Sequence, residues 1–274
     1  MKNIIMLSFL LTFALGAHAQ EFDETIAIPL STPGERGKLE VGLVRGDIYI
    51  EAYNGTEVII EAKAGSGEGD CDSCDDKRRS SNRNVPTGMK RISSSPVELS
   101  ASENNNEVKV ETNSWKKPIN LTIKVPSNFD LSASTVHGKV SVAGVNGTHE
   151  ISAVHGPLTL TDVGGSILSN TVHGDIVVTL QDVTPNEPMA FVTLHGDVDV
   201  TFPSGIKAKA KMRSDQGEIF TDFDMTIDRS KPEVKSSGGE YKVSVNSWVF
   251  GNINGGGPEY TFKNMHGDII IRKK

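Results

Sequence analysis

Apolar and polar residues alternate in short runs along most of the chain. Examples are Leu39-Glu-Val-Gly-Leu43 and Leu121-Thr-Ile-Lys-Val125, with glycine and asparagine between such runs. A period of two residues is typical of β-strands that bury one face, whereas the spacings of three and four that indicate amphipathic helices are missing after the N-terminal segment. The alternation therefore predicts an all-β protein.

A self-similar unit recurs among these runs from about residue 131. Each copy places a histidine and a glycine directly before an alternating segment, as in Thr171-Val-His-Gly-Asp-Ile-Val-Val178. The four clearest copies contain His137, His155, His173 and His195, at spacings of 18, 18 and 22 residues. Weaker relatives are Val44–Ile50, Asp215–Phe220 and Met265–Ile271.

The length of the unit predicts how the strands are arranged. A period of about 18–22 residues suits one rung of a single-stranded parallel β-solenoid in which each rung stacks on the last, and a β-sandwich of hairpins is the alternative. The apolar residues return at the same offset after each glycine, as with Val140 and Val142 in one copy and Ile176 and Val178 in another. Equal offsets stack into buried columns, which favours the solenoid. A corner glycine with positive φ would join the strands of a rung.

The histidines are the most distinctive candidates for a site. If the repeats stack in register, the imidazole rings of neighbouring repeats would lie about 5 Å apart. Imidazole binds zinc and copper, but a straight row gives one ion only two close ligands, short of the three or four that a site needs. We interpret His137, His155, His173 and His195, continued by His266, as a stacked corner ladder, with a strip that binds metal ions or anions as the less favoured alternative.

The residue after each glycine is an acid in several copies. Asp47, Asp175, Asp197 and Asp268 occupy this position, and Lys139, Pro157 and Glu218 replace them elsewhere. A catalytic carboxylate is not expected to vary in this way within one chain, so we interpret the position as a solvent-facing turn. The chain also lacks a nucleophile elbow, a phosphate loop and a His-Glu-x-x-His motif, so we expect no enzyme activity, no catalytic residue and no cofactor.

The N-terminus predicts export. Lys2, the apolar stretch Ile4–Leu15 and the small-residue signature Ala17-His-Ala19 predict a signal peptide over residues 1–19. An N-terminal extension at 20–36 and the repeat domain at 37–273 follow, the latter interrupted by a polar insertion at about 65–96. No later stretch reaches the ~20 apolar residues of a transmembrane helix. We expect the protein in the periplasm, on the cell surface or outside the cell.

The two cysteines, Cys71 and Cys74, lie in that insertion as a Cys-x-x-Cys motif. In an exported protein this spacing favours a local disulfide. A redox pair would need a stabilised thiolate, which the flanking residues Asp70, Asp72, Asp75 and Asp76 disfavour. A structural zinc site would need two more ligands than the two cysteines provide.

The net charge and the aromatic content limit the classes of partner that the protein could bind. A formal net charge of -7 and a pI near 5.5 argue against nucleic-acid binding, which needs a basic face. Binding of a glycan usually uses aromatic platforms, and only Trp115 and Trp248 could serve. A cell-surface glycan or a protein remains as partner, and the sequence does not identify the binding residues.

The repeated Val-His-Gly-Asp-Ile units, together with the C-terminal run from Asn254-Gly-Gly-Gly-Pro258 to His266-Gly-Asp-Ile-Ile-Ile271, resemble the bacterial putative-adhesin family of β-strand repeat proteins. The resemblance covers roughly residues 37–273 outside the insertion. It implies an exported envelope protein built as a parallel β-solenoid that acts as an adhesin or scaffold, and it supplies no catalytic residues. The alternative is a glycan-binding or carbohydrate-active β-helix protein.

Overall fold

The computed structural model describes residues 23–64, 99–112, 117–229, 233–237, 240–244 and 248–274. These residues form strands and turns without any helix, which confirms the all-β prediction. No helix among them is therefore long and apolar enough to cross a membrane. The predicted signal peptide, the insertion at about 65–96 with Cys71 and Cys74, and Trp115 lie outside the described residues, and the predicted domain bounds stay predictions.

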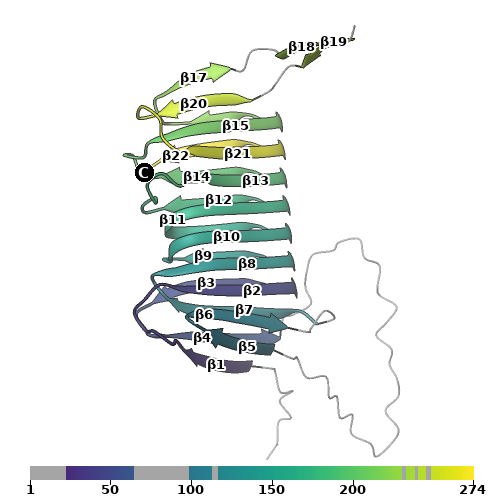
Figure 1. The fold of residues 1–274 in the computed structure, drawn as a ribbon. Coiled ribbons are helices and arrows are strands. Elements are labelled where there is room, and N and C mark those ends of the chain that lie inside the picture. The colour runs from purple at the N-terminus through teal and green to yellow at the C-terminus, as the bar shows by residue number, and fades with distance from the viewer. Residues whose placement is uncertain (1–22, 65–98, 113–116, 230–232, 238–239, 245–247) are drawn as a thin grey trace, which may run out of the picture.

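Twenty of the strands form one sheet that folds around the core as a front and a back layer (Figure 1). The front layer contains β2 (Gly37–Arg45), β5 (Leu99–Asn104), β6 (Glu107–Thr112), β8 (Phe129–His137), β10 (Asn146–His155), β13 (Met189–His195), β15 (Ala208–Gln216), β17 (Met225–Arg229), β20 (Val249–Ile253) and β21 (Glu259–His266). The back layer contains β1 (Asp23–Pro29), β3 (Ile48–Tyr53), β4 (Glu57–Ala64), β7 (Ile119–Pro126), β9 (Val140–Ala143), β12 (Ile176–Leu180), β14 (Val198–Phe202), β16 (Ile219–Thr221) and β22 (Ile269–Lys273). The long strand β11 (Leu158–His173) belongs to both layers, and β18 (Glu233–Ser237) and β19 (Glu240–Ser244) form a separate antiparallel pair.

Strand pairing is mixed. In the middle of the stack the front strands pair in parallel in the order β2, β8, β10, β11, β13, β21 and β15. The back strands also pair in parallel, in the order β3, β9, β11, β12, β14, β22 and β16. At the lower end β1 pairs with β4, β4 with β7 and β5 with β6 in antiparallel fashion, and at the upper end β20 pairs so with β15 and β17. The prediction of an entirely parallel solenoid over residues 37–273 is therefore wrong at both ends.

The order of the rungs also differs from the order of the chain. The C-terminal rung, β21 with β22, lies between the β13–β14 rung and the β15–β16 rung. At the lower end the β2–β3 rung pairs directly with the β8–β9 rung, because β4 to β7 lie beneath it. The expected stacking of each rung on the last holds only from β8 to β14.

The core consists of the apolar columns that the repeat predicts. Five valines, two leucines and one isoleucine after the corner glycines are at most 1% exposed: Val140, Val142, Leu158, Leu160, Ile176, Val178, Val198 and Val200. Adjacent members pair in register across the rungs. Burial of such a side chain stabilises the fold by about 1.5 to 3 kcal/mol, so the columns hold the rungs together.

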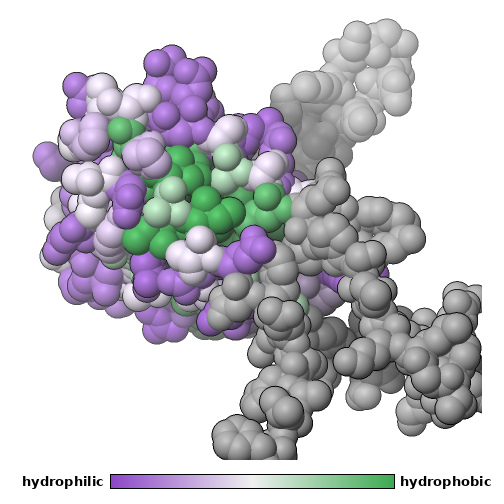
Figure 2. Space-filling view, turned by 90° about the horizontal axis from the view of Figure 1, so that it is seen from below, coloured by the Kyte–Doolittle hydropathy of each residue, from purple (hydrophilic) through white to green (hydrophobic). Residues whose placement is uncertain are grey.

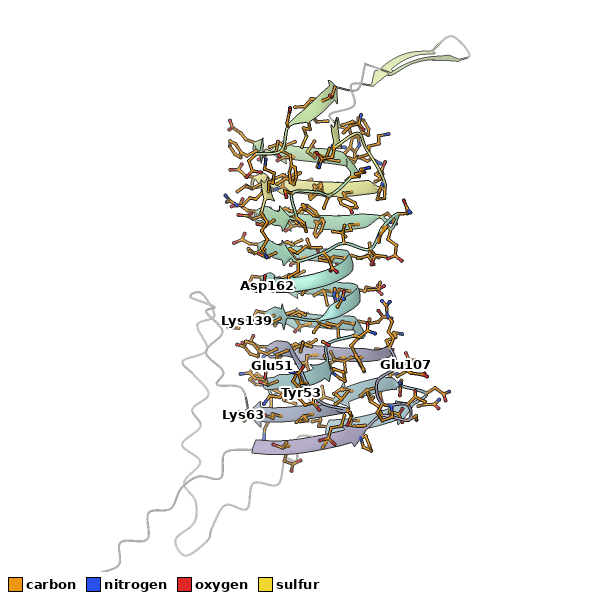
Figure 3. The ribbon with its side chains drawn as sticks, turned by 90° about the vertical axis from the view of Figure 1, so that its left-hand side faces the viewer. Glu51, Tyr53, Lys63, Glu107, Lys139 and Asp162 are labelled. Atoms are coloured by element: carbon orange, nitrogen blue, oxygen red, sulfur yellow. The ribbon has the colours of Figure 1, made fainter. Side chains whose placement is uncertain are left out.

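The ends and flanks of the stack differ in polarity. Seen from the β1 end, apolar surface lies in the middle of the end face and polar residues border it (Figure 2). The flank in Figure 3 instead carries charged side chains, among them Glu51, Lys63 and Lys139. Lys124 forms ion pairs with Glu61 and Glu51 across three back-layer strands, with N–O distances of 3.2 and 3.7 Å.

Candidate functional site

The corner between the two layers brings five histidines into one column. Strands β8, β10, β11, β13 and β21 each end in a histidine, and these residues pair in register in the order His137, His155, His173, His195 and His266. Neighbouring ring centroids lie 4.8, 5.0, 4.9 and 4.5 Å apart, with interplanar angles of 4 to 15°. The expected spacing of about 5 Å is confirmed. Arg45 continues the column below His137, and Gln216 continues it beyond His266.

A glycine after each histidine makes this stacking possible. Gly138, Gly156 and Gly174 have φ angles of 148, 151 and 150°. Residues with a Cβ rarely adopt this backbone conformation. A Cβ on Gly156 would lie 1.9 Å from the carbonyl oxygen of Gly138. The amide of Gly156 donates to the carbonyl oxygen of His173 over 2.8 Å, and the neighbouring glycines repeat this bond. The predicted corner glycine is thus required both by φ and by close approach of the backbones.

The aspartates after these glycines have a role that the sequence analysis missed. A carboxylate oxygen of Asp197 accepts the backbone N–H of Asp268 over 2.8 Å, and Asp175 accepts that of Asp197 over 2.9 Å. Asp47 and Asp268 accept in the same way from Lys139 and Glu218. These acids are exposed or partly exposed, as the interpretation as solvent-facing turn residues expects, and in addition they join one rung to the next.

The exception to this pattern has a direct physical cause. Lys139 occupies the position of the aspartate in the rung beneath Pro157. Proline has no backbone N–H, so no acceptor is needed below it. The side chain of Lys139 instead lies over the ring of Tyr49, 5.0 Å from its centroid. The lysine at this position is therefore explained by the hydrogen bonding of the next rung.

Aliphatic residues run beside the histidine column. The residue before each histidine, or before Arg45 in the first rung, is Val44, Val136, Val154, Val172, Leu194 or Met265. Four of them are markedly exposed, at 43% for Val44, 37% for Val136, 37% for Leu194 and 40% for Met265. We call these six aliphatic residues together with the five stacked histidines the Val-His edge.

Neighbouring histidines of the Val-His edge affect the pKa of His195. The pKa of His195 is lowered, first by loss of solvation and then by the charges of His266 and His173. A charge on His266 or His173 therefore makes protonation of His195 less favourable. Near-parallel rings also direct their nitrogens side by side rather than toward a common point, and no three metal-ligating side chains converge anywhere in the described part of the chain.

One further histidine lies inside the molecule. His149 is fully buried on β10, between Leu131 and Ile167 of the adjacent strands. Its Nε2 lies 3.0 Å from the carbonyl oxygen of Gly164, whereas its Nδ1 is buried without a partner. Burial lowers its pKa. The sequence signal was present, because His149 shares the alternation of Ile151 and Ala153.

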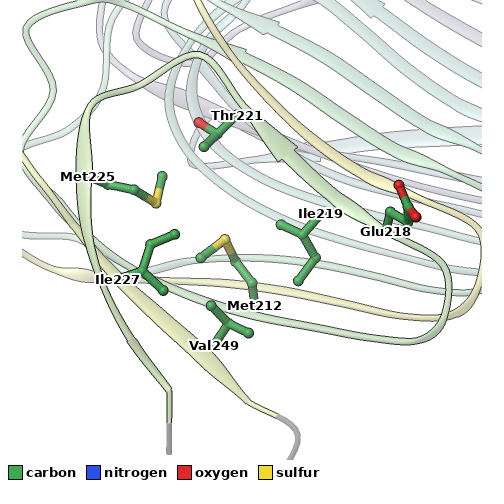
Figure 4. A pocket seen from close by; sticks show the side chains of 7 residues that line it. All are labelled: Met212, Glu218, Ile219, Thr221, Met225, Ile227 and Val249. Atoms are coloured by element: carbon green, nitrogen blue, oxygen red, sulfur yellow. The ribbon is translucent and has the colours of Figure 1, made fainter.

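An apolar cavity of about 370 Å³ opens at the upper end of the stack, where β17 leaves it (Figure 4). Two methionines, two isoleucines and a valine supply most of the lining: Met212, Met225, Ile219, Ile227 and Val249. Thr221 and the exposed Glu218 complete it. With a single titratable side chain, the cavity has no pair of groups for acid–base chemistry.

The sequence matches no known protein family and no curated protein. Among solved structures, the chain is similar to a "putative cell adhesion protein" from Clostridium sporogenes ATCC 15579, with 10% identity and a TM-score of 0.48, over 93% of this chain and 100% of the other. It is also similar to a "putative adhesin" from Bacteroides fragilis NCTC 9343, with 12% identity and a TM-score of 0.36, over 92% and 97% of the two chains. Likeness at this level bears neither on a ligand nor on a function.

Proposed function

We propose that the chain is a non-enzymatic, exported protein of the cell envelope or surface that acts as an adhesin or scaffold. We further infer that its middle section is a parallel β-solenoid closed at both ends by antiparallel strands. The observation that carries the proposal is the Val-His edge, because it repeats one pair of exposed or partly exposed side chains from rung to rung along the stack. Contiguous exposed apolar residues with a polar border are typical of interaction surfaces.

Rigidity supports the same function. Successive rungs are joined by buried aliphatic columns, by histidine stacking and by the aspartate bonds at the corner. A partner that binds along the edge therefore meets side chains whose positions are already fixed, and little conformational entropy is lost on binding. A cell-surface glycan or protein with its own repeat would contact several rungs at once.

The test compares an edge variant with a matched control. The edge variant is Val44→Ser with Val136→Ser, and the control is Leu168→Ser with Val177→Ser, whose side chains are similarly exposed, at 45% and 42%, but lie away from the edge. Immobilised wild-type protein should retain intact cells or envelope fragments of the producing organism, and the edge variant should lose most of this retention while the control keeps it.

Two outcomes contradict the proposal. Equal retention by the edge variant and the wild type would remove the edge from binding, and turnover of any polysaccharide by the purified protein would refute the non-enzymatic assignment. Fractionation of the producing cells tests the location, because recovery in the cytoplasm would contradict export.

A further inference from the structure

Basic side chains gather on the outer surface of the front layer near its upper end. Along β15 the buried residues alternate with Lys209, Lys211 and Arg213, which point outward. Lys263 of β21 lies opposite Arg213 in the parallel pairing. We call these four residues the basic patch, and it stands out in a chain whose formal net charge is -7.

The charges of the patch are only partly neutralised. Lys211 pairs with Glu259 over 3.2 Å, and Arg213 pairs with Asp215 over 2.7 Å. Within the described residues no carboxylate lies within ion-pair distance of Lys209 or Lys263. Four cations thus face two carboxylates, which leaves an excess of positive charge on this surface.

Aromatic rings hold part of the patch in place. The ammonium of Lys209 lies 5.3 Å from the ring centroid of Phe250, and that of Lys211 lies 5.0 Å from the ring of Trp248. The guanidinium of Arg213 lies 5.9 Å from the same indole ring. Such contacts restrict long, flexible side chains. The cations are therefore ordered before any ligand arrives, which lowers the entropic cost of binding.

A shallow groove of about 270 Å³ adjoins these cations. Val192, Leu194 and Met265 contribute apolar surface to it, and Arg213 and Lys263 contribute charge. Asn264, Asp215, Thr171 of β11 and Thr193 of β13 complete the lining. The groove combines an aliphatic floor, suited to the C–H faces of sugar rings, with donors for anionic groups.

We propose that the basic patch and this groove bind an acidic polysaccharide, with sugar rings over Leu194 and Met265 and carboxylate or sulfate groups on Lys263, Arg213 and Lys209. The inference rests on the proposed function in that it names a ligand class for an adhesin. The groove shares Leu194 and Met265 with the Val-His edge, whereas the basic patch and the residues Val44 and Val136 of the edge variant are separate from each other. Nucleic acid fits less well, because its dense phosphates call for a far more basic protein.

The experiment measures binding of fluorescently labelled oligogalacturonate and of a labelled heparin fragment to the purified mature chain, by fluorescence anisotropy. The two probes separate carboxylate from sulfate recognition. The variant is Lys209→Gln with Lys263→Gln, since both side chains are exposed and neither supports a buried group. We expect at least one probe to bind wild type and the Kd to rise about tenfold in the variant, because charged hydrogen bonds contribute about this much.

The control variant is Lys38→Gln with Lys139→Gln. It removes the same charge from exposed sites elsewhere, and Lys139 lies over Tyr49 much as Lys209 lies over Phe250. Its Kd should equal that of wild type, and added salt should weaken binding. The proposal is overturned if neither acidic probe binds, if neutral dextran or single-stranded DNA binds equally well, or if the patch variant binds like wild type.

The two proposals can fail separately. Loss of cell retention in Val44→Ser with Val136→Ser, alongside unchanged probe binding by the Lys209 and Lys263 variant, would refute the polysaccharide site and leave the adhesive edge. The opposite pattern would refute the edge and leave the polysaccharide site.

Discussion

Single residues at the corner tolerate little change, and Gly156 is the clearest case. Its φ of 151° and the distance of only 1.9 Å that a Cβ would have from the carbonyl oxygen of Gly138 both oppose any side chain. We expect Gly156→Ala to lower the free energy of unfolding by at least about 3 kcal/mol, because rigid backbone would have to move. Urea unfolding followed by circular dichroism measures this change.

The matched control is Gly205→Ala. A Cβ on Gly205 meets nothing within 4 Å, so its substitution should change the free energy of unfolding by no more than about 0.5 kcal/mol. If both alanine variants unfold at the same urea concentration, the corner is softer than its geometry implies.

His149 makes stability depend on pH from inside the core. Burial lowers its pKa below the ordinary 6.5, so the folded protein keeps this ring neutral while the unfolded chain protonates it. Its stabilising effect is therefore complete above about pH 6.5 and falls as pH drops, by up to about 1.4 kcal/mol per pH unit. We expect His149→Leu to reduce the loss of stability between pH 7 and pH 5, as measured by urea unfolding at each pH.

Ile151→Leu is the control for this prediction. It alters a neighbouring buried position of β10 without removing a titratable group. Its unfolding free energy should shift equally at both pH values. An unchanged pH dependence in His149→Leu would mean that the buried ring is protonated in the folded protein or takes no part in the acid response.

At the scale of elements, the aspartate bonds connect rungs that the apolar columns also join. Asp197→Ala leaves the N–H of Asp268 without its acceptor, which should cost about 1 to 2 kcal/mol of unfolding free energy. Lys139→Ala, at the equivalent position beneath Pro157, removes no such bond and should cost less than about 0.5 kcal/mol. Thermal and urea unfolding of the two variants compare them directly, and equal losses would show that the aspartates act only as turn residues.

The alternation of apolar and polar residues predicts some features of the strands but not others. The strands, the buried columns at Val140 and Ile176 and the register of the histidines follow from equal offsets in the repeat. Alternation states which face of a strand is buried, but not which strand lies next to it. The antiparallel ends and the insertion of β21 between β13 and β15 could therefore not be predicted, because those partners are set by packing far along the chain.

Of the two candidate surfaces, one could be predicted from the sequence and the other could not. The Val-His edge was predictable as a column, since His155 and its equivalents recur in the sequence. The basic patch was not, because Arg213 and Lys263 are 50 residues apart and meet only when the C-terminal rung enters the stack out of chain order. The bonds of Asp197 were likewise hidden, since a turn aspartate and an aspartate that joins two rungs look alike in sequence.

At the scale of the whole molecule, the stacked histidines should make the protein less stable in acid. Neighbouring rings lie 4.5 to 5.0 Å apart, and the pKa of His195 is lowered by loss of solvation and by the adjacent histidines. His195 thus binds a proton less readily in the folded protein than in the unfolded chain, so stability falls as pH drops below the ordinary histidine pKa of about 6.5. The variant His155→Asn with His173→Asn removes three of the four stacked pairs and leaves only His195 beside His266. We expect the loss of melting temperature between pH 7 and pH 5 to be smaller in this variant than in wild type by about 3 °C. Because His149 is present in both proteins, its contribution cancels in the comparison, and an equal loss in both would show that the ladder does not respond to acid.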